Sequence, residues 1–331
     1  MKIAILTMPL LDSYGGILQN YALQLILKKL KINSITLDIP FPSVPFWRFI
    51  CSTIKTIAYR CVGKKRVFVK RKKNTRNSSF FDFVHQHIET VFFKNYDNIR
   101  VAGFDSIIVG SDQVWRPKYN YRIEDMFLKF AEKLSIKRIA YAASFGVDNW
   151  EYTPKQTFEC AALAKKFDAI SVREESGINL CKQHLGVDAT WVLDPTLLLD
   201  KEDYCEISKD IPAVKEKILA AYILDKNDTV RTQCESIAAE QGLSLKFFEA
   251  GTNATLSVPE WLAMFRDASY VVTDSFHGTV FSIIFGKEFK CLYNKSRGSA
   301  RFDSLLKLYE SGKLDEMREY SLNWLKNALE K

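Results

Sequence analysis

Short apolar runs alternate with amphipathic stretches along most of the chain. Apolar, β-branched runs are typical of buried strands, and apolar residues at three- and four-residue spacing are typical of helices. The runs that predict strands are 2–8, 34–39, 106–110, 138–143, 169–172, 217–224, 244–249, 270–272 and 289–293. The stretches that predict helices are 17–30, 79–90, 154–167, 228–241, 259–267, one that begins after 278, and 317–329. Strands that alternate with helices form parallel sheets, so the pattern predicts an α/β fold.

The chain is predicted to form two domains. Its 331 residues exceed what one hydrophobic core usually supports. The strand–helix alternation restarts after 199–212, which is predicted to be a linker. We therefore expect two Rossmann-like domains, residues 1–200 and 201–331, that face each other across a cleft. The last helix is expected to pack back across the domains.

The composition is that of a soluble globular protein, with 47% hydrophobic and 26% charged residues. Seven cysteines without a C-x-x-C pair argue against a disulfide framework and a structural zinc site. The start, MKIAILTMPLLD, predicts a first strand and not a signal peptide. No run of about 18 uncharged apolar residues predicts a membrane span. These features predict a cytoplasmic protein.

The net charge of +8 is concentrated in one segment. Residues 43–81 contain eleven lysines and arginines and no acidic residue. Within them, 46–62 has its apolar residues on one stripe, which is typical of a helix that rests on an anionic membrane surface, where each basic residue contributes about 1 kcal/mol. A solvated basic loop is an alternative. Nucleic acid is not expected as a partner, because no stacking-aromatic or helix-turn-helix pattern accompanies the charges.

Polar residues follow the predicted strand 270–272, where a helix begins. They are Asp274, Ser275, His277, Gly278 and Thr279. Ligands of α/β sheets collect outside the carboxyl ends of the strands, and a helix N-terminus favours anions. An imidazole at this place can donate to a phosphate and move a proton near neutral pH. An ordinary strand-to-helix turn, capped by Ser275 or Asp274, is the alternative.

Other predicted strand ends carry polar groups as well. They are Gly15, Gly16, Gln19 and Asn20 after the first strand, Ser111, Asp112 and Gln113 after 106–110, Ser144 after 138–143, and Arg173 after 169–172. Each has an ordinary alternative: a tight turn, a cap, or a surface ion pair of Arg173 with Glu174 or Glu175. The glycine pair is not a G-x-G-x-x-G fingerprint, so no nicotinamide site is expected. His85 and His87 face different sides of a helix, and no metal site is predicted.

Five stretches, in this order, resemble the signature of the polysaccharide pyruvyl transferase family. They are 13–23 (SYGGILQNYAL), 107–115 (IIVGSDQVW), 170–176 (ISVREES), 192–198 (VLDPTLL) and 273–278 (TDSFHG). The resemblance implies phosphoenolpyruvate as donor, without a further cofactor. It implies a hydroxyl pair of a capsular or exopolysaccharide sugar, or of its lipid-linked precursor, as acceptor. The products are then a cyclic pyruvate ketal and phosphate, formed at the inner face of the membrane.

This reaction needs cations for the donor, an acid for its methylene carbon and a base for the sugar hydroxyls. His277, Asp274 and Asp112 are the predicted catalytic residues. The predicted donor-binding residues are Arg173, Ser275, Gly278, Thr279, Arg297 and Arg301. The predicted acceptor-binding residues are Gly15, Gly16, Gln19, Asn20, Ser111, Gln113 and Ser144.

The chain departs from the family pattern at one place. Many members have Arg-Leu-His where this sequence has Ser275-Phe276-His277. An anion-binding arginine is therefore absent at position 275, and either Arg297 or Arg301 replaces it or the donor is bound differently. Two other functions stay open: a sugar-nucleotide-dependent glycosyltransferase, which shares the two-Rossmann architecture, and a non-catalytic relative that binds an anion or a sugar.

Overall fold

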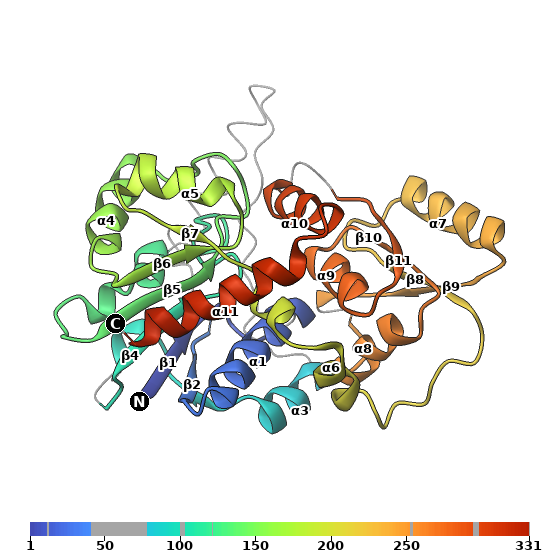
Figure 1. The fold of residues 1–331 in the computed structure, drawn as a ribbon, viewed down its shortest axis with the longest axis horizontal. Coiled ribbons are helices and arrows are strands. Elements are labelled where there is room, and N and C mark those ends of the chain that lie inside the picture. Colours follow the sequence, from blue (N-terminus) through green and yellow to red (C-terminus); the bar gives the residue numbers. More distant parts are fainter. Residues whose placement is uncertain are drawn as a thin grey trace, which may run out of the picture.

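A computed structural model describes residues 1–11, 13–40, 78–99, 103–120, 122–251, 254–293 and 298–330. The predicted surface helix 46–62, most of the basic segment 43–81 and Arg297 lie outside these residues. The described chain forms two parallel α/β units side by side (Figure 1). The predicted fold class is therefore confirmed.

The first sheet has seven parallel strands in the order β3-β2-β1-β4-β5-β6-β7. They are β1 (Lys2–Leu6), β2 (Asn33–Asp38), β3 (Thr90–Phe92), β4 (Ser106–Gly110), β5 (Lys137–Ala143), β6 (Ala169–Val172) and β7 (Thr190–Trp191). Its helices are α1 (Tyr14–Lys29), α3 (Ser78–His87), α4 (Pro154–Ala164) and α5 (Ser176–Leu180). The strand order reverses direction between β1 and β4, which is where ligands bind in sheets of this kind.

The second sheet has four parallel strands in the order β11-β10-β8-β9. They are β8 (Ile218–Tyr222), β9 (Ser244–Phe248), β10 (Tyr270–Thr273) and β11 (Glu288–Cys291). Its helices are α7 (Asp228–Gln241), α8 (Val258–Asp267), α9 (Phe276–Ile284) and α10 (Ala300–Glu310). The segment predicted as the linker contains a helix, α6 (Lys201–Ile207). The carboxyl edges of both sheets thus supply the loops that build the site.

The two units share one apolar core, because Tyr14 at the start of α1 reaches the second domain. Its ring stacks on Trp261 of α8 at 5.0 Å between centroids, and its hydroxyl donates to the Leu256 carbonyl at 2.6 Å. Burial raises the pKa of this hydroxyl well above its usual range. The junction is therefore packed like a protein interior and holds the two carboxyl edges in a fixed relation.

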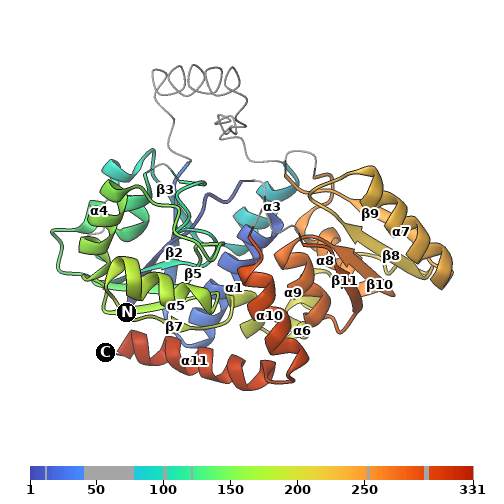
Figure 2. The same ribbon diagram turned by 90° about the horizontal axis from the view of Figure 1, so that it is seen from above.

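The last helix, α11 (Leu314–Glu330), returns to the first domain, as the sequence predicts (Figure 2). The Leu193 amide donates to Ser321 Oγ at 3.0 Å, and Lys137 Nζ donates to the Leu329 carbonyl at 2.7 Å. Both ends of the described chain consequently lie beside the first sheet. Within the described ranges, none of the helices combines the length and the apolar character that crossing a membrane requires.

Candidate functional site

A cavity of about 270 Å³ lies between the domains, where the carboxyl edges of the two sheets meet. From the first domain it is lined by Ser13, Gly15, Asp112 and Gln113. From the second domain its polar and aromatic wall includes Asp274, Ser275, Phe276, His277, Arg301 and Phe302. Both domains therefore contribute residues that the sequence analysis selects.

Arg173, directly after β6, joins two loops of the first domain. Its Nη1 lies 2.7 Å from Asp194 Oδ2, and its Nη2 lies 3.2 Å from Asp112 Oδ1. The side chain is 1% exposed, so the predicted alternative of a surface ion pair is wrong. The neighbouring Glu174 instead accepts from the Phe145 and Gly146 amides. Two carboxylates hold the guanidinium of Arg173 from one side.

Asp194, after β7, is the carboxylate at the centre of this cluster. Its Oδ1 accepts from the Thr196 amide and hydroxyl at 3.0 and 2.7 Å, and its Oδ2 also accepts from Ser111 Oγ at 3.1 Å. Burial disfavours the charge, but His277, Arg173 and Thr196 outweigh burial and hold the pKa of this carboxyl far below its usual range. The sequence analysis did not select Asp194, although it lies in the VLDPTLL stretch.

His277 is in the first turn of α9 and faces the first domain. Its Nε2 lies 3.7 Å from Asp194 Oδ2, which is an ion-pair distance and longer than a hydrogen bond. This nitrogen is buried and has no hydrogen-bond partner in the described part of the chain. The ring packs on Gly15 of α1 so closely that a Cβ at position 15 would overlap it. His277 thus sits at the junction of the domains, beside the carboxylate of Asp194.

Asp112, after β4, has a positive φ of 71° and presents its carboxylate to the cavity. Burial by itself raises the pKa of this carboxyl, but the charges of Arg173, His277 and Arg301 outweigh burial and lower it. The predicted residues Asp112, Arg173 and His277 therefore form one electrostatic cluster, completed by Asp194.

Arg301, in the first turn of α10, adds a second buried guanidinium. It is 8% exposed, and its Cζ lies 5.3 Å from the centre of the Phe276 ring, which Arg173 Cζ approaches to 4.7 Å. Burial, and then the charge of Arg173, lower the pKa of Arg301 to about 10. Among the described residues no carboxylate lies within ion-pair distance of it, although the charges of Glu174 and Asp112 act on it from farther away, and its Nε has no hydrogen-bond partner there.

Asp274 and Ser275 line the cavity, and their side-chain oxygens accept hydrogen bonds from backbone amides. The carboxylate oxygens of Asp274 accept from the Leu224 and Asp225 amides at 2.7 and 2.8 Å, which holds the loop after β8. Ser275 caps α9 by accepting from the Gly278 amide at 3.3 Å. A Cβ at Gly278 would collide with Thr273, so this glycine lets α9 pack on β10.

Four other predicted residues lie behind the cavity wall, without exposure. They are Gln19, Asn20, Ser144 and Thr279. Gln19 accepts from the Ser111 amide at 3.0 Å and donates to Thr7 Oγ1 at 2.9 Å, so it joins the loops after β1 and β4. Asn20 accepts from Thr36 Oγ1 at 2.9 Å. The structure does not bring these side chains to the cavity surface; Gln19 braces two of the loops that form it, and Asn20 bonds to strand β2.

The described residues contain no group of three His, Cys, Asp or Glu side chains arranged as for a metal ion. His184 stacks on Trp150 with 4.4 Å between ring centres, and His87 lies against Phe83 at 4.6 Å. Both rings lie outside the interdomain cavity.

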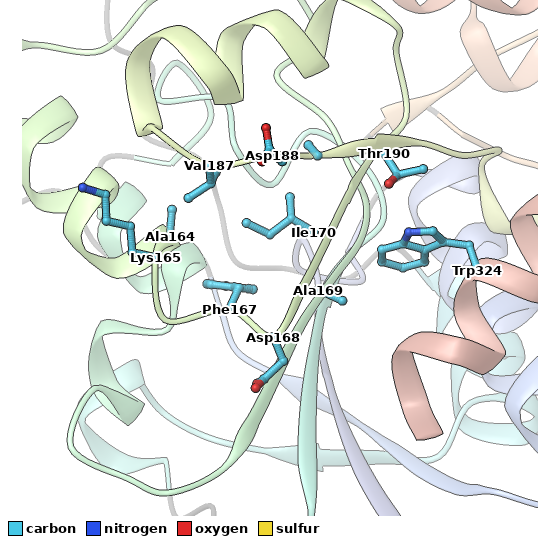
Figure 3. A pocket seen from close by; sticks show the side chains of 11 residues that line it. Ala164, Lys165, Phe167, Asp168, Ala169, Ile170, Val187, Asp188, Thr190 and Trp324 are labelled. Atoms are coloured by element: carbon cyan, nitrogen blue, oxygen red, sulfur yellow. The ribbon is translucent and has the colours of Figure 1, made fainter. Parts of the chain in front are cut away.

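A larger hollow, of about 450 Å³, lies at the opposite edge of the first sheet, where β6 and β7 begin (Figure 3). The polar ends of Lys165, Asp168 and Asp188 point in different directions there. It has no convergent polar groups and lies away from the carboxyl edge, where ligands of such sheets bind. The interdomain cavity is therefore the candidate site.

Fold and site together define a protein of two facing Rossmann-like domains with guanidinium, carboxylate and imidazole groups in the cavity between them. The sequence matches the profile described as polysaccharide pyruvyl transferase over residues 14–296. The chain belongs to the polysaccharide pyruvyl transferase family. The family resemblance of the five sequence stretches is confirmed.

Solved structures with a similar fold have low sequence identity. A functionally uncharacterised protein of Klebsiella pneumoniae has a TM-score of 0.50 and 12% identity, over 92% of this chain and 88% of that chain. A UDP-GlcNAc 2-epimerase of Methanocaldococcus jannaschii has a TM-score of 0.49 and 11% identity, over 94% of this chain and 92% of that chain. An α-glucosyltransferase in complex with UDP and DNA has a TM-score of 0.48 and 11% identity, over 98% of this chain and 95% of that chain. A search of curated protein sequences gave no significant match.

Proposed function

We propose that the protein transfers the enolpyruvyl group of phosphoenolpyruvate to a hydroxyl pair of a sugar in a cell-surface polysaccharide or its lipid-linked precursor. The product is a cyclic pyruvate ketal, and phosphate is released. The family supports a sugar acceptor. The structural observation that supports the donor is Arg301, a guanidinium at the cavity wall that forms no ion pair among the described residues and whose buried Nε has no hydrogen-bond partner there. A buried guanidinium whose hydrogen-bond donors are not all satisfied is costly, and an anionic ligand relieves that cost.

The reaction forms two carbon–oxygen bonds at the central carbon of the donor, and it breaks one carbon–oxygen bond and the π bond to the methylene carbon there. Both sugar oxygens bond to that carbon, and the carbon–oxygen bond to the phosphate breaks. The two sugar hydroxyls lose two protons. The methylene carbon gains one proton and becomes a methyl group, and the released phosphate takes the other. The site therefore has to accept protons from hydroxyls and deliver one to carbon, which a neighbouring imidazole and carboxylate can share.

His277 is the proposed acid and base, because it lines the cavity and imidazole is the side chain that most often acts as a general acid or base in enzymes. Asp194 Oδ2 lies 3.7 Å from its buried Nε2, and Asp112 is the carboxylate of the same cluster that lines the cavity. Arg301 is the proposed cation for the donor phosphate or carboxylate. Arg173 is already paired with two carboxylates, so it contributes less free charge to the donor than Arg301 does.

The proposal that the acceptor is bound at a membrane rests on charge outside the site. A lipid-linked acceptor lies on a membrane, and residues 43–81 hold eleven basic residues without an acidic one. We propose that this segment attracts the protein to the anionic inner leaflet, which would bring the cavity to its acceptor.

The test is a mass-spectrometric assay with phosphoenolpyruvate and methyl galactoside, methyl glucoside or N-acetylmannosamine, with phosphate release followed in parallel. A product heavier by one pyruvate ketal, absent with His277→Ala, is the expected result. Tighter binding of a nucleoside diphosphate than of phosphoenolpyruvate, without ketal, would favour glycosyl transfer instead. Donor binding that survives His277→Ala, with no turnover by the unmutated protein, would identify a non-catalytic relative.

A further inference from the structure

The carboxamide of Gln113, after β4, lines the cavity and is held at one end. Arg116 Nη1 donates to Gln113 Oε1 at 3.0 Å. A guanidinium can only donate hydrogen bonds, so the carbonyl end of the carboxamide has to face Arg116. The amino end, with its two N–H donors, therefore points away from Arg116.

Arg116 is itself fixed. Its Nε and Nη2 donate to the two carboxylate oxygens of Glu151 at 2.9 and 3.1 Å, a bidentate pair, and its side chain is 2% exposed. The guanidinium also lies 5.3 Å from the centre of the Tyr119 ring. With these contacts Arg116 cannot turn away and let the carboxamide of Gln113 reverse.

Gly146, in the loop after β5, also lies against the carbonyl end of the carboxamide. This glycine has a positive φ of 74°, and a Cβ at its position would overlap Gln113 Oε1. Its amide donates to Glu174 Oε1 at 3.0 Å, which keeps the loop in place. The carbonyl of Gln113 is therefore enclosed by Arg116 and Gly146.

We propose that Gln113 is a specificity-determining residue, whose amide N–H donates to a hydroxyl oxygen of the acceptor sugar. Arg116 and Glu151 are positioning residues that fix this polarity. The identity of the substrate rests on the proposed function. The neutral N–H group of an amide suits a neutral hydroxyl, whereas the negative charges of phosphoenolpyruvate suit the guanidinium of Arg301. A site built to donate a hydrogen bond rejects analogues that cannot accept it.

Gln113→Glu tests the specificity role, because it keeps the shape and replaces the donor by an acceptor. Arg116 then makes a charge-assisted bond, so we expect an unfolding midpoint in urea no lower than that of the unmutated protein. We expect the KM for the acceptor that gives most ketal to rise roughly tenfold or more, and the KM for phosphoenolpyruvate to change less than about twofold. If Gln113 had only a structural role, the KM for the acceptor alone would not rise in a variant that is as stable as the unmutated protein. Gln241→Glu, at the exposed end of α7, is the matched control.

A double-mutant cycle with Arg116→Met tests the fixed polarity without any substrate. We expect Gln113→Glu to lower the unfolding free energy in the Arg116→Met background and not in the unmutated background. An equal effect in both backgrounds would overturn the positioning role. An unchanged acceptor KM in Gln113→Glu would overturn the specificity role. If no acceptor gives ketal, the proposed function fails and the sugar role of Gln113 with it, while the cycle still decides what Arg116 does.

Discussion

Gly15, in the first turn of α1, lies directly against the imidazole of His277, in the first turn of α9, so that a Cβ on Gly15 would overlap three atoms of the ring. The two residues belong to different domains, and each begins a helix at the carboxyl edge of its own sheet. Their contact closes one side of the cavity. It also keeps His277 Nε2 beside Asp194.

Gly15→Ala should therefore displace the imidazole of His277. Overpacking of this kind costs about 1–3 kcal/mol of stability. A displacement of about 1 Å at a catalytic group lowers turnover on the order of 100-fold. Urea unfolding and the ketal assay measure the two effects.

The control for this substitution is the same change in a His277→Ala background. With the ring removed, alanine has room and favours the helix by up to about 1 kcal/mol over glycine. Gly15→Ala should then stabilise the protein or leave its stability unchanged. An equal loss in both backgrounds would show that the ring is not what excludes a side chain at position 15.

Arg301→Met should leave the protein at least as stable and weaken its binding of phosphoenolpyruvate. The substitution replaces a buried guanidinium that forms no ion pair among the described residues, and whose Nε has no hydrogen-bond partner there, by an apolar side chain of similar length. A charge-assisted hydrogen bond to the donor contributes about 1.5–3 kcal/mol, so the KM for phosphoenolpyruvate should rise by about 10- to 100-fold.

Arg231→Met is the matched control, because this side chain is 66% exposed on α7 and pairs only loosely with Glu235. It should change neither quantity. A destabilised Arg301→Met with an unchanged KM for phosphoenolpyruvate would make Arg301 a structural cation, and the donor would have to bind elsewhere.

Much of the fold and part of the site follow from the sequence for one reason: buried parallel strands are continuous apolar runs whose ends are easy to find. The bounds predicted for β4, Ser106–Gly110, and β6, Ala169–Val172, are those observed. Asp112 and Arg173 were each predicted as site residues at strand ends, and the carboxyl ends of parallel strands share one edge; Arg173 Nη2 lies 3.2 Å from Asp112 Oδ1.

What the sequence analysis missed depends on tertiary contacts. Asp194 follows β7, a strand of two residues that is too short to form a pattern. Gln19 and Asn20 were expected to face an acceptor, but polarity alone does not distinguish a ligand-facing amide from one that is buried and bonded within the protein. The pairing of Arg116 with Glu151, 35 residues later, is visible only in the folded chain.

Arg173→Lys should lower both stability and donor affinity, although it preserves the charge. One ammonium group cannot reach Asp194 and Asp112 as the two ends of the guanidinium do. The loss of one buried charge-assisted bond costs about 1–3 kcal/mol. Urea unfolding and the KM for phosphoenolpyruvate test this, and an unchanged KM would refute a role for the guanidinium fork in donor binding.

Arg122→Lys is a matched control, because Arg122 also joins two carboxylates, those of Asp97 and Asp125, away from the cavity. It should lower stability and leave the KM for phosphoenolpyruvate unchanged. If both substitutions alter that KM equally, general destabilisation and not the site would be responsible.

Neutralising residues 70–73, which are Lys70, Arg71, Lys72 and Lys73, should weaken binding to vesicles that contain anionic lipid. Each charge near such a surface contributes about 1 kcal/mol, so removing four should lower the partition coefficient by more than tenfold. Turnover of a soluble acceptor should not change. Sedimentation with vesicles of phosphatidylserine and phosphatidylcholine measures the binding, and equal sedimentation of the neutralised protein would remove the membrane proposal.

Asp194→Asn should make the stability of the protein depend less on pH. The pKa of Asp194 is depressed in the folded state, so its carboxylate stabilises the fold above the unfolded pKa of about 3.9, and this stabilisation is lost as the pH falls below that value. At pH 7 the variant should be less stable by roughly 1.5–3 kcal/mol. At pH 3 the difference in stability should be smaller, because the carboxylate of the unmutated protein then stabilises the fold less.

Urea unfolding at both pH values tests this, with Asp188→Asn, whose side chain is 88% exposed, as the control. A difference that is the same at both pH values would mean that Asp194 acts through its shape and hydrogen bonds and not through its charge.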